Sequence, residues 1–172
     1  FLLLVRGAWA LDMPFRRRYS KAVSAKNPQL RGKDIETTRK SGEKFKSQPT
    51  TVINFVEGTR FTDEKHQQKN SPFECLLPPK AGGIAFTLAA MGELFTNILD
   101  VSIAYPQNRR HPMFEMLSGQ MTHIVIDVRV LEVNDDVIGD YFNNNNFKQR
   151  FQQWLNDLWH TKDQRLKQLL GC

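Results

Sequence analysis

The chain has 172 residues, of which 40% are hydrophobic and 24% are charged, and this composition is ordinary for a globular protein. The length favours one α/β domain with a sizeable core over several small domains. The two cysteines, Cys75 and Cys172, lie far apart in the sequence, so it indicates neither a disulfide framework nor a metal site, and we expect a reducing compartment.

The net charge of +6 is unevenly distributed along the chain. Residues 1–50 contain twelve Lys and Arg against four Asp and Glu, whereas residues 51–172 contain twelve against fourteen. A basic N-terminal part favours anionic partners such as phosphate head groups, coenzyme A, an acidic membrane surface or nucleic acid. Nucleic acid is disfavoured, because aromatic residues are not interleaved with the basic ones as a base-stacking surface requires. A solvated basic face is the alternative.

No segment reaches the roughly 20 apolar residues that a membrane-spanning helix requires. The longest uncharged stretch, residues 81–92, predicts a buried helix instead. The sequence starts at Phe1 without an initiator methionine and shows no signal peptide. We therefore expect a piece of a longer protein, whose membrane attachment would lie before residue 1.

Three adjacent arginines, Arg16, Arg17 and Arg18, follow a short apolar segment that ends at Pro14. Adjacent guanidinium groups form a credible phosphate clamp, since each can donate two parallel hydrogen bonds. A basic surface turn is the alternative. Residues 33–47 then predict a weakly amphipathic helix.

Residues 52–56 are mostly β-branched or aromatic and predict a buried strand. The strand breaks at Gly58, next to the polar residues Glu57, Thr59 and Arg60. Polar groups that follow a buried strand form ligand sites in α/β proteins. Gly58 would let a ligand approach the backbone, and the guanidinium of Arg60 suits phosphate. A surface turn with an ordinary Glu–Arg ion pair is the alternative.

Residues 63–71 are polar and predict a mobile loop, in which His66 is solvated rather than catalytic, because no carboxylate is placed to orient it. Pro79, Lys80 and Gly82 then lead into an apolar helix. The free N–H groups of a helix start bind anions, and Lys80 adds positive charge there. Close packing of helix against sheet is the alternative role for the glycines.

The C-terminal half predicts two strands and one long helix. Residues 98–105 predict a strand, and residues 121–132 alternate in a way that predicts a half-exposed strand near a sheet edge. Four asparagines then precede the clearest helix in the chain, with Asn146 expected as its N-cap. Its apolar stripe predicts a core-packing surface, with an interfacial membrane helix as the alternative: Phe147, Phe151, Trp154, Leu155, Leu158 and Trp159.

Residues 55–62, Phe-Val-Glu-Gly-Thr-Arg-Phe-Thr, resemble the Glu-Gly-Thr-Arg block of the PlsC-like lysophosphatidic acid acyltransferases, a superfamily of glycerolipid acyltransferases. Lys65 and His66 continue the block as they do in one subgroup, and residues 76–80 match the Leu-Leu-Pro segment that follows it there. The run at residues 9–15 is similar to that of bacterial YihG-like members. Two blocks in the right order are more specific than one, and the resemblance covers residues 9–106.

The resemblance implies one partial acyltransferase domain over residues 1–172, ending in an amphipathic helix at residues 147–170. The implied fold is a mixed β-sheet flanked by helices, like that of glycerol-3-phosphate acyltransferases, with its N-terminal part missing. The implied reaction moves a fatty acyl group from acyl-CoA or acyl carrier protein to the hydroxyl of a lysophosphatidic acid-like glycerophospholipid. No metal and no further cofactor is implied. The implied location is the cytoplasmic face of a bacterial inner membrane, with the membrane surface as a partner.

Within that family the acceptor and donor sites map onto two groups of residues in this sequence. The acceptor is expected at Glu57, Gly58, Thr59 and Arg60, with Arg17 or Arg18 assisting. The donor's carrier is expected beside Pro79, Lys80 and Gly82.

The family's catalytic pair is a His and an Asp separated by four residues, and the His removes the proton from the acceptor hydroxyl. None of the four histidines in this sequence has an Asp five positions later. We therefore expect the pair upstream of residue 1, and we expect this chain alone to bind substrate weakly without turnover. The alternative is a degenerate relative that binds lipid or a membrane surface without catalysis.

Overall fold

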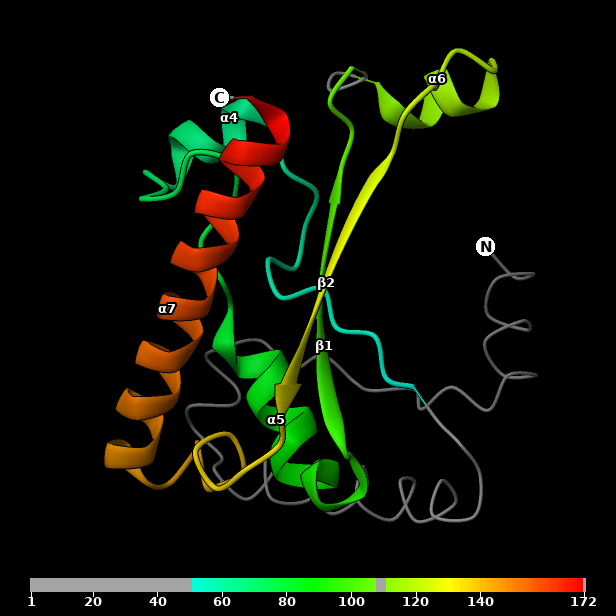
Figure 1. The fold of residues 1–172 in the computed structure, drawn as a ribbon. Coiled ribbons are helices and arrows are strands. Elements are labelled where there is room, and N and C mark those ends of the chain that lie inside the picture. The colour runs from blue at the N-terminus through cyan, green and yellow to red at the C-terminus, as the bar shows by residue number, and fades with distance from the viewer. Residues whose placement is uncertain (1–50, 108–110, 172) are drawn as a thin grey trace, which may run out of the picture.

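The computed structural model describes residues 51–107 and 111–171 (Figure 1). In chain order the elements are helix α4 (Asp63–Gln68), helix α5 (Ala81–Met91), the 3-10 helix η2 (Gly92–Leu94), strand β1 (Asn97–Ala104), helix α6 (Pro112–Leu117), strand β2 (Val125–Glu132) and helix α7 (Asn145–Leu170). This combination of helices with a two-stranded sheet confirms the mixed α/β character. The predictions for residues 1–50, including Arg17 and Arg18, lie outside the described residues.

Strands β1 and β2 form an antiparallel pair with two very different faces. On the outer face, three aliphatic pairs lie opposite one another across the strands: Leu99 and Val130, Val101 and Val128, Ile103 and Ile126. These six side chains are 43% to 64% exposed. On the inner face, Asp100, Ser102 and Ala104 are buried. The alternation that predicted a half-exposed strand is present, but the aliphatic side chains point outward and the polar ones inward.

Helix α7 is the longest element and packs along the inner side of the hairpin (Figure 1). Its N-cap is Asn144, whose side chain accepts a hydrogen bond from Phe147 N at 3.0 Å. Asn146 is therefore not the cap, because the helix has already begun at Asn145. At the other end the chain leaves the helix through Gly171, whose φ of 67° is the left-handed conformation usual there.

The apolar stripe of α7 joins two hydrophobic clusters. Leu155 and Trp159 belong to one cluster, with Phe73, Leu76, Ala104 and Leu166. Phe147 and Phe151 belong to the other, with Ala85, Leu88, Val137 and Tyr141. The stripe is therefore core, as expected, and α7 is the element against which α5 and the loop before it pack.

The predicted buried strand at residues 52–56 is wrong. Residues 51–55 have no strand conformation, and the side chains of Ile53 and Phe55 are 75% and 82% exposed. A strand needs a partner for its ladder, and within the described ranges β1 and β2 pair only with each other. The end of this segment is held by a hydrogen bond from Lys80 N to Val56 O, at 2.9 Å, and by packing of the Val56 side chain against a core cluster.

The predicted mobile loop at residues 63–71 is also wrong, since most of it is helix α4. The Thr62 side chain caps the helix by accepting from Lys65 N at 3.3 Å. Asp63 and Glu64 occupy the first turn, where negative charge is favourable. Local capping outweighs the polar composition on which the loop prediction rested.

Candidate functional site

The turn at residues 57–60 is held in a shape that requires glycine. Gly58 N donates to Phe55 O at 2.9 Å, and Gly58 has a φ of 68°, a conformation that side chains disfavour. A Cβ atom at Gly58 would lie 3.1 Å from Lys80 Nζ. The group that approaches this glycine is therefore the ammonium of Lys80, and the two candidate residues lie together although 22 positions separate them in the sequence.

Lys80 also directly precedes helix α5, which begins at Ala81. It is the N-cap, and its side chain makes no capping hydrogen bond, so the first N–H groups of α5 have no cap among the described residues. Gly82 lies in this first turn, with open space where its side chain would be. Gly83 faces the side chain of Asn54 at ordinary contact distance. The start of α5 thus lies next to the 57–60 turn.

Arg60 and Thr59 differ in how they are engaged. Lys65 Nζ donates to Thr59 Oγ1 at 2.9 Å and to Arg60 O at 3.2 Å, which ties the turn to α4. The guanidinium of Arg60 is exposed and makes no ion pair with the residues that the structure describes. The alternative of a simple Glu–Arg pair at this turn is therefore not what the structure has.

Glu57, the first residue of the turn, is half-buried and lies close enough to Lys69 and Lys162 to feel their charges. Burial raises the pKa of the Glu57 carboxyl, and the N–H of Leu77 with the charges of Lys69 and Lys162 offsets only part of that rise. Lys69 Nζ is fully enclosed and has no hydrogen-bond partner in the described part of the chain. An enclosed ammonium without a partner is unusual, because desolvating a charge is costly. Lys69 is the functional candidate that the sequence reasoning missed.

Lys162 and Asp163 are buried on α7 and act as structural charges. Lys162 Nζ lies 2.5 Å from Asp100 Oδ1 and donates to Val101 O at 2.9 Å. Asp100 also pairs with Arg129 at 2.6 Å. Asp163 accepts from Glu74 N and Cys75 N at 3.0 and 2.8 Å. These contacts bind α7 to the hairpin on one side and to the loop at residues 72–79 on the other.

His66 is part of the framework rather than a solvated residue, contrary to the prediction. Its Nε2 lies 2.5 Å from Phe73 O, and its ring is 5.5 Å from the ring of Phe61. The prediction failed because α4 turns the imidazole toward the 72–79 loop.

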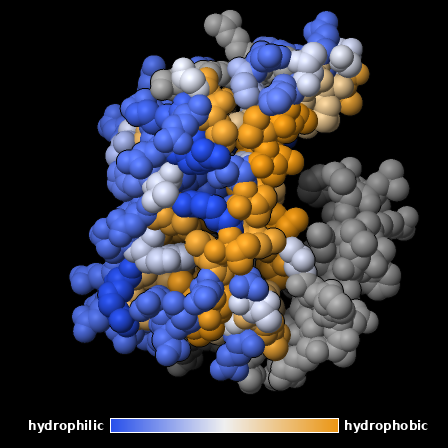
Figure 2. All heavy atoms as spheres, in the orientation of Figure 1, coloured by the Kyte–Doolittle hydropathy of each residue, from blue (hydrophilic) through white to orange (hydrophobic). Residues whose placement is uncertain are grey.

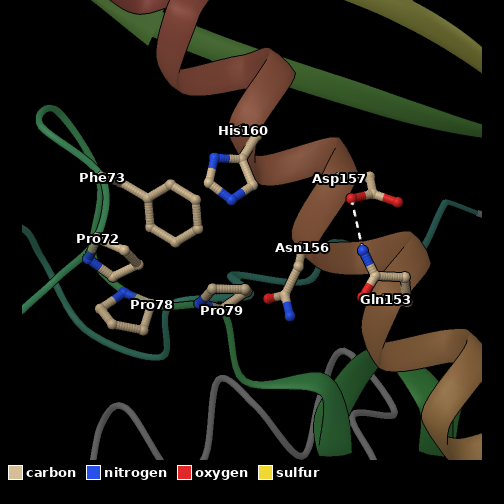
Figure 3. Close-up of a pocket in the computed structure, with 8 residues that line it drawn as sticks. All are labelled: Pro72, Phe73, Pro78, Pro79, Gln153, Asn156, Asp157 and His160. Atoms are coloured by element: carbon tan, nitrogen blue, oxygen red, sulfur yellow. Dashed lines mark hydrogen bonds between the residues drawn. The ribbon is translucent and has the colours of Figure 1, made fainter.

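A pocket of about 300 Å³ opens between the 72–79 loop and α7 (Figure 3). The loop supplies Pro72, Phe73, Pro78 and Pro79, and the helix supplies Gln153, Asn156, Asp157 and His160. Pro79 is one of the residues expected beside the donor. The four helix residues were not predicted, and the only signal for them in the sequence is the polar i, i+4 spacing of Asn156 and His160.

The predicted site residues that the structure describes thus fall into three places: the 57–60 turn, the start of helix α5 and the pocket. Glu57, Gly58, Thr59 and Arg60 form one turn, with Lys80 over it and Gly82 just beyond. Pro79 lines the pocket on the other side of Lys80.

Comparisons with protein-family models, with curated proteins and with solved structures each gave no match. Within residues 51–107 and 111–171, no helix combines the length and apolar character needed to cross a bilayer. The same residues contain no group of three or more His, Cys, Asp or Glu side chains that could hold a metal ion.

Proposed function

We propose that the full-length protein is an acyltransferase that moves a fatty acyl group from acyl-CoA or acyl carrier protein to the hydroxyl of a lysophosphatidic acid-like glycerophospholipid. The observation that carries the proposal is the Glu-Gly-Thr-Arg turn, whose guanidinium is exposed and free of any described carboxylate. Lys65 and Lys80 lie against the same turn. A turn whose guanidinium has no carboxylate partner among the described residues, with ammonium groups beside it, suits a phosphate monoester, which carries up to two negative charges.

In this proposal each group has a distinct role. Arg60 binds the acceptor's phosphate, and Glu57 accepts a hydrogen bond from its glycerol. Lys80 and the open N–H groups of α5 lie beside the donor. The proposal assigns the general base to none of these residues and places the protein at the cytoplasmic face of a bacterial inner membrane.

The proposal is tested by steady-state kinetics on the full-length protein with an acyl-CoA donor and lysophosphatidic acid as acceptor. Arg60→Ala should raise the Michaelis constant for the acceptor about tenfold or more, because it removes a charge-assisted hydrogen bond. Arg150→Ala is the matched control, since Arg150 is exposed on α7 and contacts the ring of Phe147. An unchanged acceptor constant in Arg60→Ala would remove the phosphate assignment.

A second candidate, a non-catalytic module that binds a lipid surface, is favoured by the outer face of the hairpin. Figure 2 shows hydrophobic residues as a continuous band along the hairpin, beside the hydrophilic surface of α7. Helix α6 extends the apolar surface at the far end of the hairpin with four exposed side chains: Met113, Phe114, Met116 and Leu117. Together with the basic composition of residues 1–50, this surface suits an anionic bilayer.

Co-sedimentation with vesicles of phosphatidylglycerol and phosphatidylcholine separates the two candidates. The module predicts binding to anionic vesicles that survives Glu57→Ala and is lost in Phe114→Glu, with no consumption of thioester by the full-length protein. The acyltransferase predicts thioester consumption that Glu57→Ala reduces.

A further inference from the structure

We propose that the pocket between the 72–79 loop and α7 binds the adenine ring of an adenine nucleotide, and that the carboxamide of Asn156 recognises the edge of the base. The link between this pocket and the acyl donor rests on the proposed function. If that function holds, the pocket identifies the carrier of the acyl group as a nucleotide, coenzyme A, rather than a protein. Four features of the pocket support it.

The pocket is preformed, because hydrogen bonds fix its loop wall at several points. Trp159 Nε1 donates to Leu77 O at 3.1 Å, and Ser71 Oγ donates to Leu76 O at 2.7 Å. The carboxylate of Asp163 holds the N–H groups of Glu74 and Cys75. A ligand therefore binds without having to order this loop, which is a large part of the usual cost of binding.

The walls are flat, apolar and rigid. Pro72, Pro78 and Pro79 present rings that have no side-chain rotation to lose on binding. The ring of Phe73 is buried and packs against that of His160, with centroids 4.9 Å apart, so the exposed imidazole of His160 is the ring that a ligand meets (Figure 3). Planar heteroaromatic rings stack on such surfaces, and stacking on one aromatic side chain gives substantial affinity for any base.

The polar groups distinguish one base from another. Asn156 and His160 lie one turn apart on α7, and the Asn156 side chain points toward Pro79 (Figure 3). The Asn156 carboxamide makes no hydrogen bond to the residues described, whereas the neighbouring Gln153 amide is engaged by Asp157 at 2.8 Å. A free carboxamide has a donor and an acceptor side by side, which match N7 and the N6 amino group of adenine. Guanine offers two acceptors at that edge and does not match.

The position along the chain connects the pocket to the 57–60 turn. Pro79 lines the pocket, and the next residue, Lys80, reaches Gly58 with its side chain and Val56 O with its backbone. A nucleotide bound through its base at the pocket would have its phosphates near this lysine. Coenzyme A carries an adenine nucleotide and acyl carrier protein does not, so the pocket favours a coenzyme A thioester as the donor.

The experiment measures binding of adenosine monophosphate and guanosine monophosphate to the full-length protein by isothermal titration calorimetry. The two probes carry the same phosphate and differ in the base. Wild-type protein should bind the adenine nucleotide about tenfold more tightly, the lower range of discrimination for a bidentate base contact. Asn156→Asp should remove this preference, because a carboxylate cannot donate to N7. Asn146→Asp makes the same chemical change at an exposed position of α7 and should leave it intact.

The inference is wrong if the folded wild-type protein does not bind the adenine nucleotide, if it binds both nucleotides equally, or if Asn156→Asp retains the preference. Asn156 is exposed, so circular dichroism should show an unchanged fold in both variants. Thioester consumption, measured separately, keeps this inference distinct from the proposed function. Turnover of acyl-CoA without a preference for the adenine nucleotide would contradict the adenine pocket but not the proposed acyl transfer. A preference for the adenine nucleotide without any turnover would contradict the proposed acyl transfer but not the adenine pocket.

Discussion

The charged residues of the α7 interface and those of the 57–60 turn are arranged in opposite ways. At the interface, buried Asp100, Lys162 and Asp163 have every charge matched by a partner. At the turn, Arg60 has no described ion-pair partner, and the nearby ammonium of Lys69, whose charge acts on Glu57, is enclosed without a described hydrogen bond. Matched buried charges hold a fold together, because removing one partner leaves the other desolvated. The exposed guanidinium of Arg60 adds little to folding and is available to a ligand, whereas the enclosed ammonium of Lys69 is not exposed to one.

The largest effect on stability is expected at the interface between α7 and the hairpin. Asp100→Ala would leave Lys162 buried without its carboxylate and should lower the free energy of unfolding by about 3–5 kcal/mol. Urea denaturation of the full-length protein, followed by circular dichroism, measures this loss. The exposed Asp135→Ala is the control, and its free energy should change by less than about 0.5 kcal/mol. Equal effects of the two substitutions would show that the buried pair is not what joins α7 to the hairpin.

A smaller effect is expected at Gly58. Gly58→Ala forces a side chain into a left-handed conformation and displaces the Lys80 ammonium, so the protein should lose about 1–2 kcal/mol of stability. Gly82→Ala is matched to it, because Gly82 has open space and helical geometry, where alanine is favoured by about 1 kcal/mol. Thermal denaturation of both variants checks the opposite signs. Destabilisation by both would contradict the conformation assigned to Gly58.

Lys69 should behave unlike the matched lysine of α7. Lys69→Met keeps the length of the side chain and removes an enclosed ammonium that has no described hydrogen bond. Because the charge of Lys69 also favours the ionised form of Glu57, the free energy of unfolding should rise by at most about 1 kcal/mol. Lys162→Met, by contrast, should destabilise the protein, because the buried Asp100 loses one of its two cationic partners and keeps only Arg129. Destabilisation by Lys69→Met would contradict the account of this residue.

The smallest effect concerns pH. Because burial raises the pKa of Glu57 above its ordinary value of 4.5, the unfolded chain ionises first as pH rises. Stability should therefore fall as pH increases from about 4.5 through the folded-state pKa of Glu57, and it should not recover above that pKa. Glu57→Gln should flatten this part of the profile, which urea midpoints between pH 4 and 8 would show. A steeper profile in the variant would contradict the raised pKa.

Local sequence patterns predicted some of the elements, whereas the packing of those elements could not be predicted. The helix at the C-terminus and both strands follow from long periodic patterns, and the 57–60 turn follows from a local motif. The sheet faces could not be assigned, because alternation separates two faces without saying which one is covered. Here the ion pairs of Asp100 and Arg129 are turned inward, and the aliphatic residues are turned outward.

The rest of the site depends on contacts between distant parts of the chain. The pocket brings Pro79 next to Asn156 and His160, which lie more than seventy positions later. Lys69 was missed because a capped helix replaces the predicted loop, and the failed strand at residues 52–56 depended on a partner that composition cannot supply. Tertiary contacts decided the pocket and the failed strand, whereas local capping decided helix α4.

The central claim, that the 57–60 turn binds a phosphorylated alcohol, is tested most directly by the dissociation constant of glycerol 3-phosphate, measured by calorimetry on the full-length protein. The wild-type protein and Arg150→Ala should bind it equally and bind glycerol without phosphate far more weakly. Arg60→Ala should bind glycerol 3-phosphate about tenfold or more weakly, with most of the preference for the phosphorylated form lost. Equal affinity of the wild type and Arg60→Ala for glycerol 3-phosphate would contradict the account.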